Sequence, residues 1–254
     1  MRIWQKYLKR AQEDETRARQ LLKCLIPNAF SFLNLSCGIM AIVLSIAGYL
    51  YPAVALILIG IFCDALDGRL ARRLNAFSRF GETLDSKADM ITFGVAPAVV
   101  IFESIRYVHP SFVGSLYAGF LGIIFFGSVF YRLRRFSRGG HSQFFDGLPS
   151  PIGAAIVILA AISLWMSSPW IVALLTCAIS GLMVSRIQYA HLEIASRHPI
   201  LKWCRIPTLI LMAISIFNLF RPAYHDQFHH YELLLGFIFI YVLSPLFVKS
   251  ELTV

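Results

Sequence analysis

Eight long apolar runs constrain the fold of this chain more than any other feature of its sequence. Several of them exceed the roughly 18 residues that distinguish a membrane-spanning helix from a buried helix of a soluble domain. The sequence therefore predicts an all-α integral membrane protein, a polytopic bundle of about eight transmembrane helices. The runs cover approximately residues 27–50, 52–73, 84–104, 112–133, 149–166, 169–185, 206–220 and 232–248.

The composition agrees with a lipid environment. Hydrophobic residues make up 57% of the 254 residues and charged residues 15%, whereas a soluble domain has about 25% charged residues. The formal charge of +9 is ascribed to loops that face anionic lipid headgroups, so membrane lipids are expected partners and nucleic acid is not. The five cysteines are scattered without CxxC spacing, which predicts neither a disulfide framework nor a zinc site.

The basic residues set the predicted orientation. If the N-terminus is cytoplasmic, only Arg106 and Arg221 of the 23 Lys and Arg residues fall on the far side of the membrane. This asymmetry predicts an even number of spans, with both termini cytoplasmic, in the inner (cytoplasmic) membrane. Residues 1–24 are too charged to span, and their apolar residues recur at helical spacing. They are interpreted as an interfacial amphipathic helix, with a solvated helix as the alternative.

Four aspartates lie near the ends of apolar runs, where a carboxylate is costly unless it is paired, hydrated or bound to metal. Asp64 and Asp67 are three residues apart at the cytoplasmic end of the second run, so they share one helix face. Asp85 and Asp89 are one helical turn apart at the start of the third run. The short connection predicts that the two helices are antiparallel neighbours, with the four carboxylates converging just inside the cytoplasmic face.

Two interpretations of this cluster follow from the residues. One is a salt-bridged helix pair without chemistry, in which the carboxylates are neutralised by Arg72, Arg73, Arg79 and Lys87. The other is a site for metal and phosphate, since carboxylate oxygens suit Mg²⁺ or Mn²⁺, which usually hold substrate phosphates as well. The small residues Gly68 and Ala71 favour the second interpretation, because they leave the carboxylate face open.

These residues resemble the motif of the CDP-alcohol phosphatidyltransferase family. The motif is D-x-x-D-G-x-x-A-R, about eight residues, and then G-x-x-x-D-x-x-x-D. All its fixed positions are occupied here, by Asp64, Asp67, Gly68, Ala71, Arg72, Gly81, Asp85 and Asp89. The resemblance implies transfer of a phosphatidyl group from a CDP-linked lipid to an alcohol with release of CMP, carried out by a metal-dependent enzyme that forms a homodimer.

The resemblance also implies roles for individual residues. Asp64, Asp67 and Asp85 would be metal ligands, and Asp89 would be both a ligand and the catalytic base, in a site for Mg²⁺ or Mn²⁺ with room for two ions. The substrate-binding positions of the motif would be Gly68, Ala71, Arg72 and Gly81.

Segments outside the motif are similar to the phosphatidylserine synthase branch of this family. They are residues 27–38, the surroundings of the motif as far as residue 97, and the stretch 145–151. The resemblance covers roughly residues 25–165. It implies a catalytic core at 25–166 followed by C-terminal transmembrane helices at 167–254. It also implies CDP-diacylglycerol and L-serine as substrates, in phospholipid biosynthesis.

Further candidates for substrate binding lie on the first and fourth runs. Asn28, Ser31 and Asn34 form a polar stripe on an apolar helix, which is either helix-packing contact or part of a cytidine pocket. Arg135, with Arg134 beside it, is a candidate for gripping the donor phosphates or the serine carboxylate, and a positive-inside anchor is the alternative.

Alternatives to this function stay open. The branch often has R-F-N after the fourth span, and here Phe136 is followed by Ser137. Another acceptor (glycerol 3-phosphate, inositol or its phosphate, choline) or an ether-lipid donor is therefore an alternative. A transporter is less favoured, because the aspartates cluster at one face and leave no trail of carboxylates across the bilayer.

Overall fold

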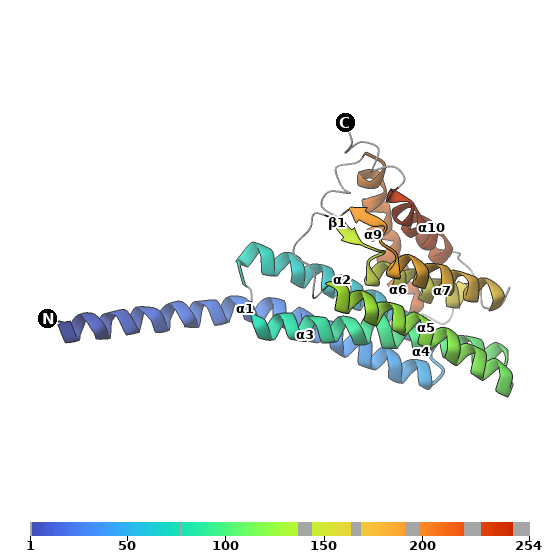
Figure 1. Cartoon of the computed structure of the whole chain (residues 1–254), viewed down its shortest axis with the longest axis horizontal. Coiled ribbons are helices and arrows are strands. Elements are labelled where there is room, and N and C mark those ends of the chain that lie inside the picture. Colours follow the sequence, from blue (N-terminus) through green and yellow to red (C-terminus); the bar gives the residue numbers. More distant parts are fainter. Residues whose placement is uncertain are drawn as a thin grey trace.

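The fold is almost entirely helical. The computed structural model describes residues 2–76, 78–136, 144–163, 169–190, 199–220 and 230–245. The helices form a bundle from which the N-terminal part of the first helix projects (Figure 1). In chain order the elements are α1 (Arg2–Ile46), α2 (Leu50–Leu74), α3 (Arg79–Asp89), the π-helix η1 (Met90–Val95), α4 (Ala96–Val108), α5 (Phe112–Phe136), β1 (Phe144–Asp146), α6 (Ser150–Ser163), α7 (Pro169–Val184), β2 (Gln188–Ala190), α9 (Pro199–Leu219) and α10 (His230–Val242).

Four helical segments are long and apolar enough to cross a membrane, and they coincide with the first four predicted runs. Large apolar side chains on them, such as Phe32, Met40, Phe120 and Ile123, are exposed. An apolar surface of this kind suits lipid, because the helix satisfies its own backbone and the side chains need no water. The chain is therefore a helical membrane protein. The four segments are Lys23–Ile46, Leu50–Leu74, Arg79–Val108 and Phe112–Arg135.

The four later runs are also helical, but their described apolar parts are shorter than a full span. Because a helix rises about 1.5 Å per residue, such segments do not by themselves cross about 30 Å of hydrocarbon. The total of eight transmembrane helices thus stays a prediction. The shorter apolar helices are Ser150–Ser163, Trp170–Val184, Ile206–Asn218 and Glu232–Val242.

α1 is one continuous helix that contains the predicted amphipathic segment 1–24 and runs on through Pro27 into the first span. A proline inside a helix removes one backbone hydrogen bond and often kinks or ends the helix, but α1 does not end there. The side chains before residue 23 lie outside the described residues, so an interfacial position for this segment stays a prediction.

α1 packs along both α2 and α3, whereas the described residues of α2 and α3 hardly contact each other. The chain reverses between them at Asn75, which adopts a left-handed conformation with φ 49°. Ser78 then starts α3 by accepting a hydrogen bond from the backbone nitrogen of Gly81 at 3.0 Å. The second and third spans are in contact, as predicted, but through η1 and α4 rather than through α3, and both α2 and α3 rest on α1. The motif aspartates lie in the gap between α2 and α3.

A π-helical turn interrupts the third span directly after Asp89. Thr92 within this turn is buried and donates a hydrogen bond to the backbone carbonyl of Asn34 in α1 at 2.9 Å. It also fits closely against Gly60 of α2, where an added Cβ would lie 2.6 Å from Thr92 Cγ2. Contacts this close fix the rotation of the third span against α1 and α2 at the level of the aspartates. Such π-turns frequently occur at functional sites.

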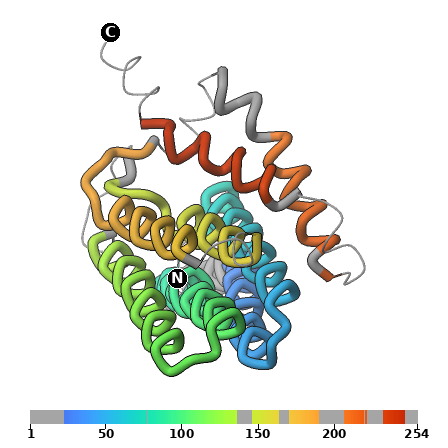
Figure 2. The backbone as a smooth tube through the Cα atoms, turned by 90° about the vertical axis from the view of Figure 1, so that its right-hand side faces the viewer, coloured from blue at the N-terminus to red at the C-terminus, as the bar shows by residue number. Residues whose placement is uncertain are grey.

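α6 forms the centre of the second half of the bundle. Its residues from Gly153 to Ile162 are buried, which agrees with a sequence that is apolar on every face. The helices α4, α7 and α10 all contact it. α9 and α10 lie together along one outer side of the bundle (Figure 2).

A short antiparallel sheet, which the sequence did not predict, joins the segments that follow α5 and α7. Phe145 of β1 pairs with Tyr189 of β2. The guanidinium of Arg135 donates hydrogen bonds to the backbone carbonyls of Asp146, Val184 and Ser185. We refer to the two strands together with Arg135 as the clip. Because α6 begins four residues after β1 ends, the clip holds the start of α6.

Candidate metal and substrate site

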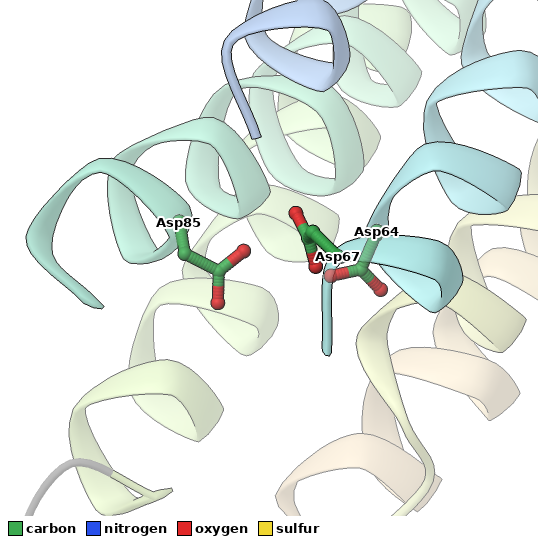
Figure 3. A group of neighbouring side chains, drawn as sticks. All are labelled: Asp64, Asp67 and Asp85. Atoms are coloured by element: carbon green, nitrogen blue, oxygen red, sulfur yellow. The ribbon is translucent and has the colours of Figure 1, made fainter. Parts of the chain in front are cut away.

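Three of the motif aspartates meet in the gap between α2 and α3. Asp64 and Asp67 come from the same face of α2, and Asp85 comes from α3, one turn after Gly81. One carboxylate oxygen of each residue lies within 4.8 Å of the corresponding oxygen of the other two. Figure 3 shows that the three carboxyl groups point into the same space. The structure therefore brings together three of the four predicted ligands in a group that could hold one metal ion.

α1 supplies hydrogen-bond donors to the same group. The Ser31 hydroxyl donates to Asp67 Oδ2 at 2.8 Å, and both side chains are buried. Asn34, which is completely buried, donates from Nδ2 to Asp89 Oδ1 at 3.4 Å. The polar stripe of the first span thus orients two of the aspartates. Ser31 and Asn34 thus form hydrogen bonds between helices, and a contact of the stripe with cytidine stays a prediction.

Asp89 lies one turn beyond Asp85 and borders the three-aspartate group. Asn34 donates to its carboxyl group from the side of α1. The π-turn begins at the next residue, so the position of Asp89 depends on the close packing around Thr92. Asp89 therefore lies at the edge of the group, next to the proposed metal ligands.

The donor set fits a hard divalent cation. The three side chains offer only carboxylate oxygens, the ligands that Mg²⁺ and Mn²⁺ prefer. Among the described residues, Asp85 Oδ1 is buried without a hydrogen-bond partner, although buried acceptors are normally satisfied. The side chains of Arg73, Arg79 and Lys87 are exposed, and none of them forms an ion pair in the described part of the chain. In the described part of the chain, Arg73, Arg79 and Lys87 therefore do not neutralise the aspartates through salt bridges.

The face of α2 beside the aspartates is open at Gly68. A Cβ added there would meet nothing closer than Arg72 Nη1, at 3.9 Å. Ala71 is partly exposed and Arg72 is exposed. The residues that the motif assigns to the nucleotide therefore line one accessible side of α2, next to Asp67.

Gly81 has a different local role, because it allows α3 to approach α1. A Cβ added to Gly81 would lie 2.5 Å from Asn28 Oδ1 and 2.9 Å from Ser78 Oγ. Any larger residue at this position would push the start of α3 away from α1. Asp85 lies one turn further along α3 and would move with it. Asn28 and Gly81, both predicted substrate contacts, therefore lie side by side.

Arg132, which the sequence patterns did not single out, is a buried arginine near the aspartates in the structure. Its side chain is only 7% exposed, and Nη1 donates to Ser150 Oγ at 2.9 Å. Its charge interacts with those of Asp64 and Asp89. The sequence did contain a signal for this residue. Arg132 lies one helical turn before Arg135 within an apolar helix, and a charged residue inside a membrane-spanning helix is a candidate functional residue. The adjacent Arg134–Arg135 pair masks this signal in the sequence.

Arg135 itself is engaged in the clip, where its guanidinium binds backbone carbonyls. The structure thus gives this residue a role in holding β1 against the end of α7. Its proposed contact with substrate stays a prediction.

Comparisons with known proteins place this architecture in a family. The family model described as CDP-alcohol phosphatidyltransferase matches residues 24–174, which include all of the site residues named above. This chain belongs to the CDP-alcohol phosphatidyltransferase family. The matched region ends within α7, so α9 and α10 lie beyond it.

Relatives within the family point to one branch. A Bacillus subtilis protein named CDP-diacylglycerol–serine O-phosphatidyltransferase is 37% identical over 170 residues, which cover 66% of this chain and 91% of that protein. A Mycobacterium leprae protein of the same name is 33% identical over 190 residues, 69% of this chain and 61% of its own length. An archaetidylserine synthase of Methanothermobacter thermautotrophicus is 36% identical over 174 residues, 66% of this chain and 70% of that protein.

Proposed function

We propose that this protein is a CDP-diacylglycerol–serine O-phosphatidyltransferase, an enzyme that transfers the phosphatidyl group of CDP-diacylglycerol to L-serine and releases CMP. The observation that carries the proposal is the meeting of the Asp64, Asp67 and Asp85 carboxylates from two helices that are apolar enough to cross a membrane. The names of the relatives support serine as the acceptor.

The chemistry that fits this site is a displacement at phosphorus. The serine hydroxyl oxygen forms a bond to the phosphorus that carries diacylglycerol, the bond from that phosphorus to the oxygen of CMP breaks, and the hydroxyl proton passes to a base. A bound Mg²⁺ or Mn²⁺ would draw charge from the pyrophosphate and stabilise the departing CMP. Asp64, Asp67 and Asp85 would hold it, with Asp89 bordering a second ion.

Asp89 is the proposed base. The hydrogen bond from Asn34 Nδ2 to Asp89 Oδ1 fixes the carboxylate and leaves its second oxygen to accept the serine proton. A general base needs this kind of fixed position within hydrogen-bond reach of the proton that it removes. On the open face of α2, Gly68, Ala71 and Arg72 would border the nucleotide, with Gly81, Asn28 and Arg135 as further substrate contacts.

The membrane setting supports a donor with acyl chains. The site lies at the ends of α2 and α3 rather than in the middle of the bundle, so a lipid headgroup and a water-soluble acceptor can both reach it. We further propose eight spans in the inner membrane, a cytoplasmic site with both termini on the same side, and a homodimer. The cytoplasmic excess of Lys and Arg supports this orientation.

The test is CMP release by the purified protein in detergent micelles containing CDP-diacylglycerol and Mn²⁺, with each acceptor supplied separately. Serine should support turnover, and glycerol 3-phosphate, inositol and choline should not. Asp89→Asn, which keeps the size of the side chain and removes the base, should abolish it. Turnover with another acceptor would replace serine while retaining the chemistry. No turnover with any acceptor would remove the enzymatic proposal.

A second donor is also worth testing, because one relative is named an archaetidylserine synthase. The experiment supplies serine together with either a CDP-activated ether lipid or CDP-diacylglycerol and measures kcat/KM for each donor. A higher kcat/KM for the ether lipid would change the proposed donor and leave the acceptor unchanged.

A further inference from the structure

Arg132 lies on α5, which packs against the span that carries Asp85 and Asp89. α5 runs antiparallel to the third span and contacts η1 and α4. A Cβ added to Gly94 would lie 3.3 Å from Val129 Cγ1, so these two residues are opposite each other. One turn further toward the site, Arg132 on α5 comes level with Asp89 on the third span. The interaction of its charge with Asp64 and Asp89 agrees with this placement.

The position of Arg132 is fixed by parts of the fold that do not carry the motif. Ser150, at the first residue of α6, binds the guanidinium, and the clip holds the start of α6 in place. From the other side, Tyr241 of α10 lies close enough for its hydroxyl to interact with the arginine charge. Tyr241 in turn stacks on Tyr189 of β2, with ring centroids 6.1 Å apart. The C-terminal helix, which lies beyond the region matched by the family, therefore reaches the site through Arg132.

A buried guanidinium and a group of buried carboxylates each carry a desolvation cost, which falls when the opposite charges lie close together. A cation at this place also repels any metal ion that enters the group. Because Ser150 tethers it, the guanidinium does not simply swing away when an ion arrives.

We propose that Arg132 is a built-in counter-charge, which balances the carboxylate group without metal and lowers the affinity of the group for divalent cations. The inference rests on the proposed metal site. Arg132 is thus a positioning residue that acts through Asp64 and Asp89, not a ligand. Its removal should tighten metal binding, the opposite of what is expected from the loss of an ordinary supporting contact, which weakens metal affinity.

The experiment measures the Kd for Mn²⁺ of the purified full chain in detergent without substrate, from the free-ion signal in electron paramagnetic resonance. Arg132→Gln removes the charge and should lower the Kd by about tenfold or more, as expected for two charges at close range at an effective dielectric constant near 20. Arg132→Lys keeps the charge and should stay near the wild-type value. Arg132→Met is a second neutral variant with the same expectation, in case the glutamine variant does not fold.

The matched control is Arg134→Gln, which removes the same charge from an exposed position on the same helix, where the guanidinium lies over the Phe130 ring. Its Kd should equal that of the wild type. Unchanged or weaker Mn²⁺ binding in both neutral variants, with intact helical circular dichroism, would overturn the role of Arg132 alone. Absence of Mn²⁺ binding that depends on Asp85 in the wild type would overturn the metal site as well, so the two failures are distinguishable.

Discussion

Ser31→Ala is the substitution that most directly tests whether α1 is part of the site. The Ser31 hydroxyl donates to Asp67 Oδ2 at 2.8 Å in a buried environment. A hydrogen bond to a charged group contributes about 1.5–3 kcal/mol. We expect the whole free energy of this hydrogen bond to stabilise Asp67 as a ligand in the transition state. Loss of the bond should then lower kcat/KM about 10- to 100-fold, since 1.4 kcal/mol corresponds to a factor of ten.

The assay is CMP release from CDP-diacylglycerol and serine over a range of Mn²⁺ concentrations. A ligand that has lost its orientation should also raise the Mn²⁺ concentration needed for half-maximal rate. Ser36→Ala is the control, since Ser36 lies on the same helix and its hydroxyl bonds only the Phe32 carbonyl of its own helix at 2.9 Å. If Ser31→Ala and Ser36→Ala both retain wild-type rates and Mn²⁺ dependence, the assignment of α1 to the site is refuted.

Three further outcomes are expected. Asn34→Leu removes the donor to Asp89 and should lower kcat while leaving the KM for serine nearly unchanged; an unaltered kcat would contradict the positioning of the base. Gly147→Ala should lower the apparent Tm by several degrees in detergent, because φ is 80° and a Cβ would strike the Met183 carbonyl, a strain of about 1–3 kcal/mol. Gly127→Ala, where nothing lies within 4 Å, is its control and should not lower the Tm. Removing metal with EDTA should stop turnover, and Mn²⁺ should restore it in the wild type but not in Asp85→Asn.

The first four spans were predictable, because each contains a long and mostly apolar run and lipid selects helices from such runs directly. The common helix face of Asp64 and Asp67 was equally predictable, because residues three positions apart are always neighbours on a helix surface. The later half of the chain was less predictable. A fully buried helix such as α6 and a lipid-facing helix are both apolar all round, so hydropathy alone does not separate them.

Other features depend on contacts between residues far apart in the chain. The pairing of β1 with β2 joins residues more than forty positions apart, and short strands of this kind carry no periodic signal. The π-turn lies where Thr92 packs against glycines of two other helices, a contact that the local sequence does not reveal.

The sequence by itself determined which chemical groups the candidate site contains, since the identity and spacing of four aspartates place carboxylates on two neighbouring apolar helices. Only the tertiary structure decided how that site is held. It placed α1 against both α2 and α3, so that Ser31 and Asn34 reach the carboxylates, and it buried Arg132 of α5 against Ser150 of α6. The physical reason is that local periodicity sets which face of a helix is polar, while the partner of that face depends on packing across the whole bundle.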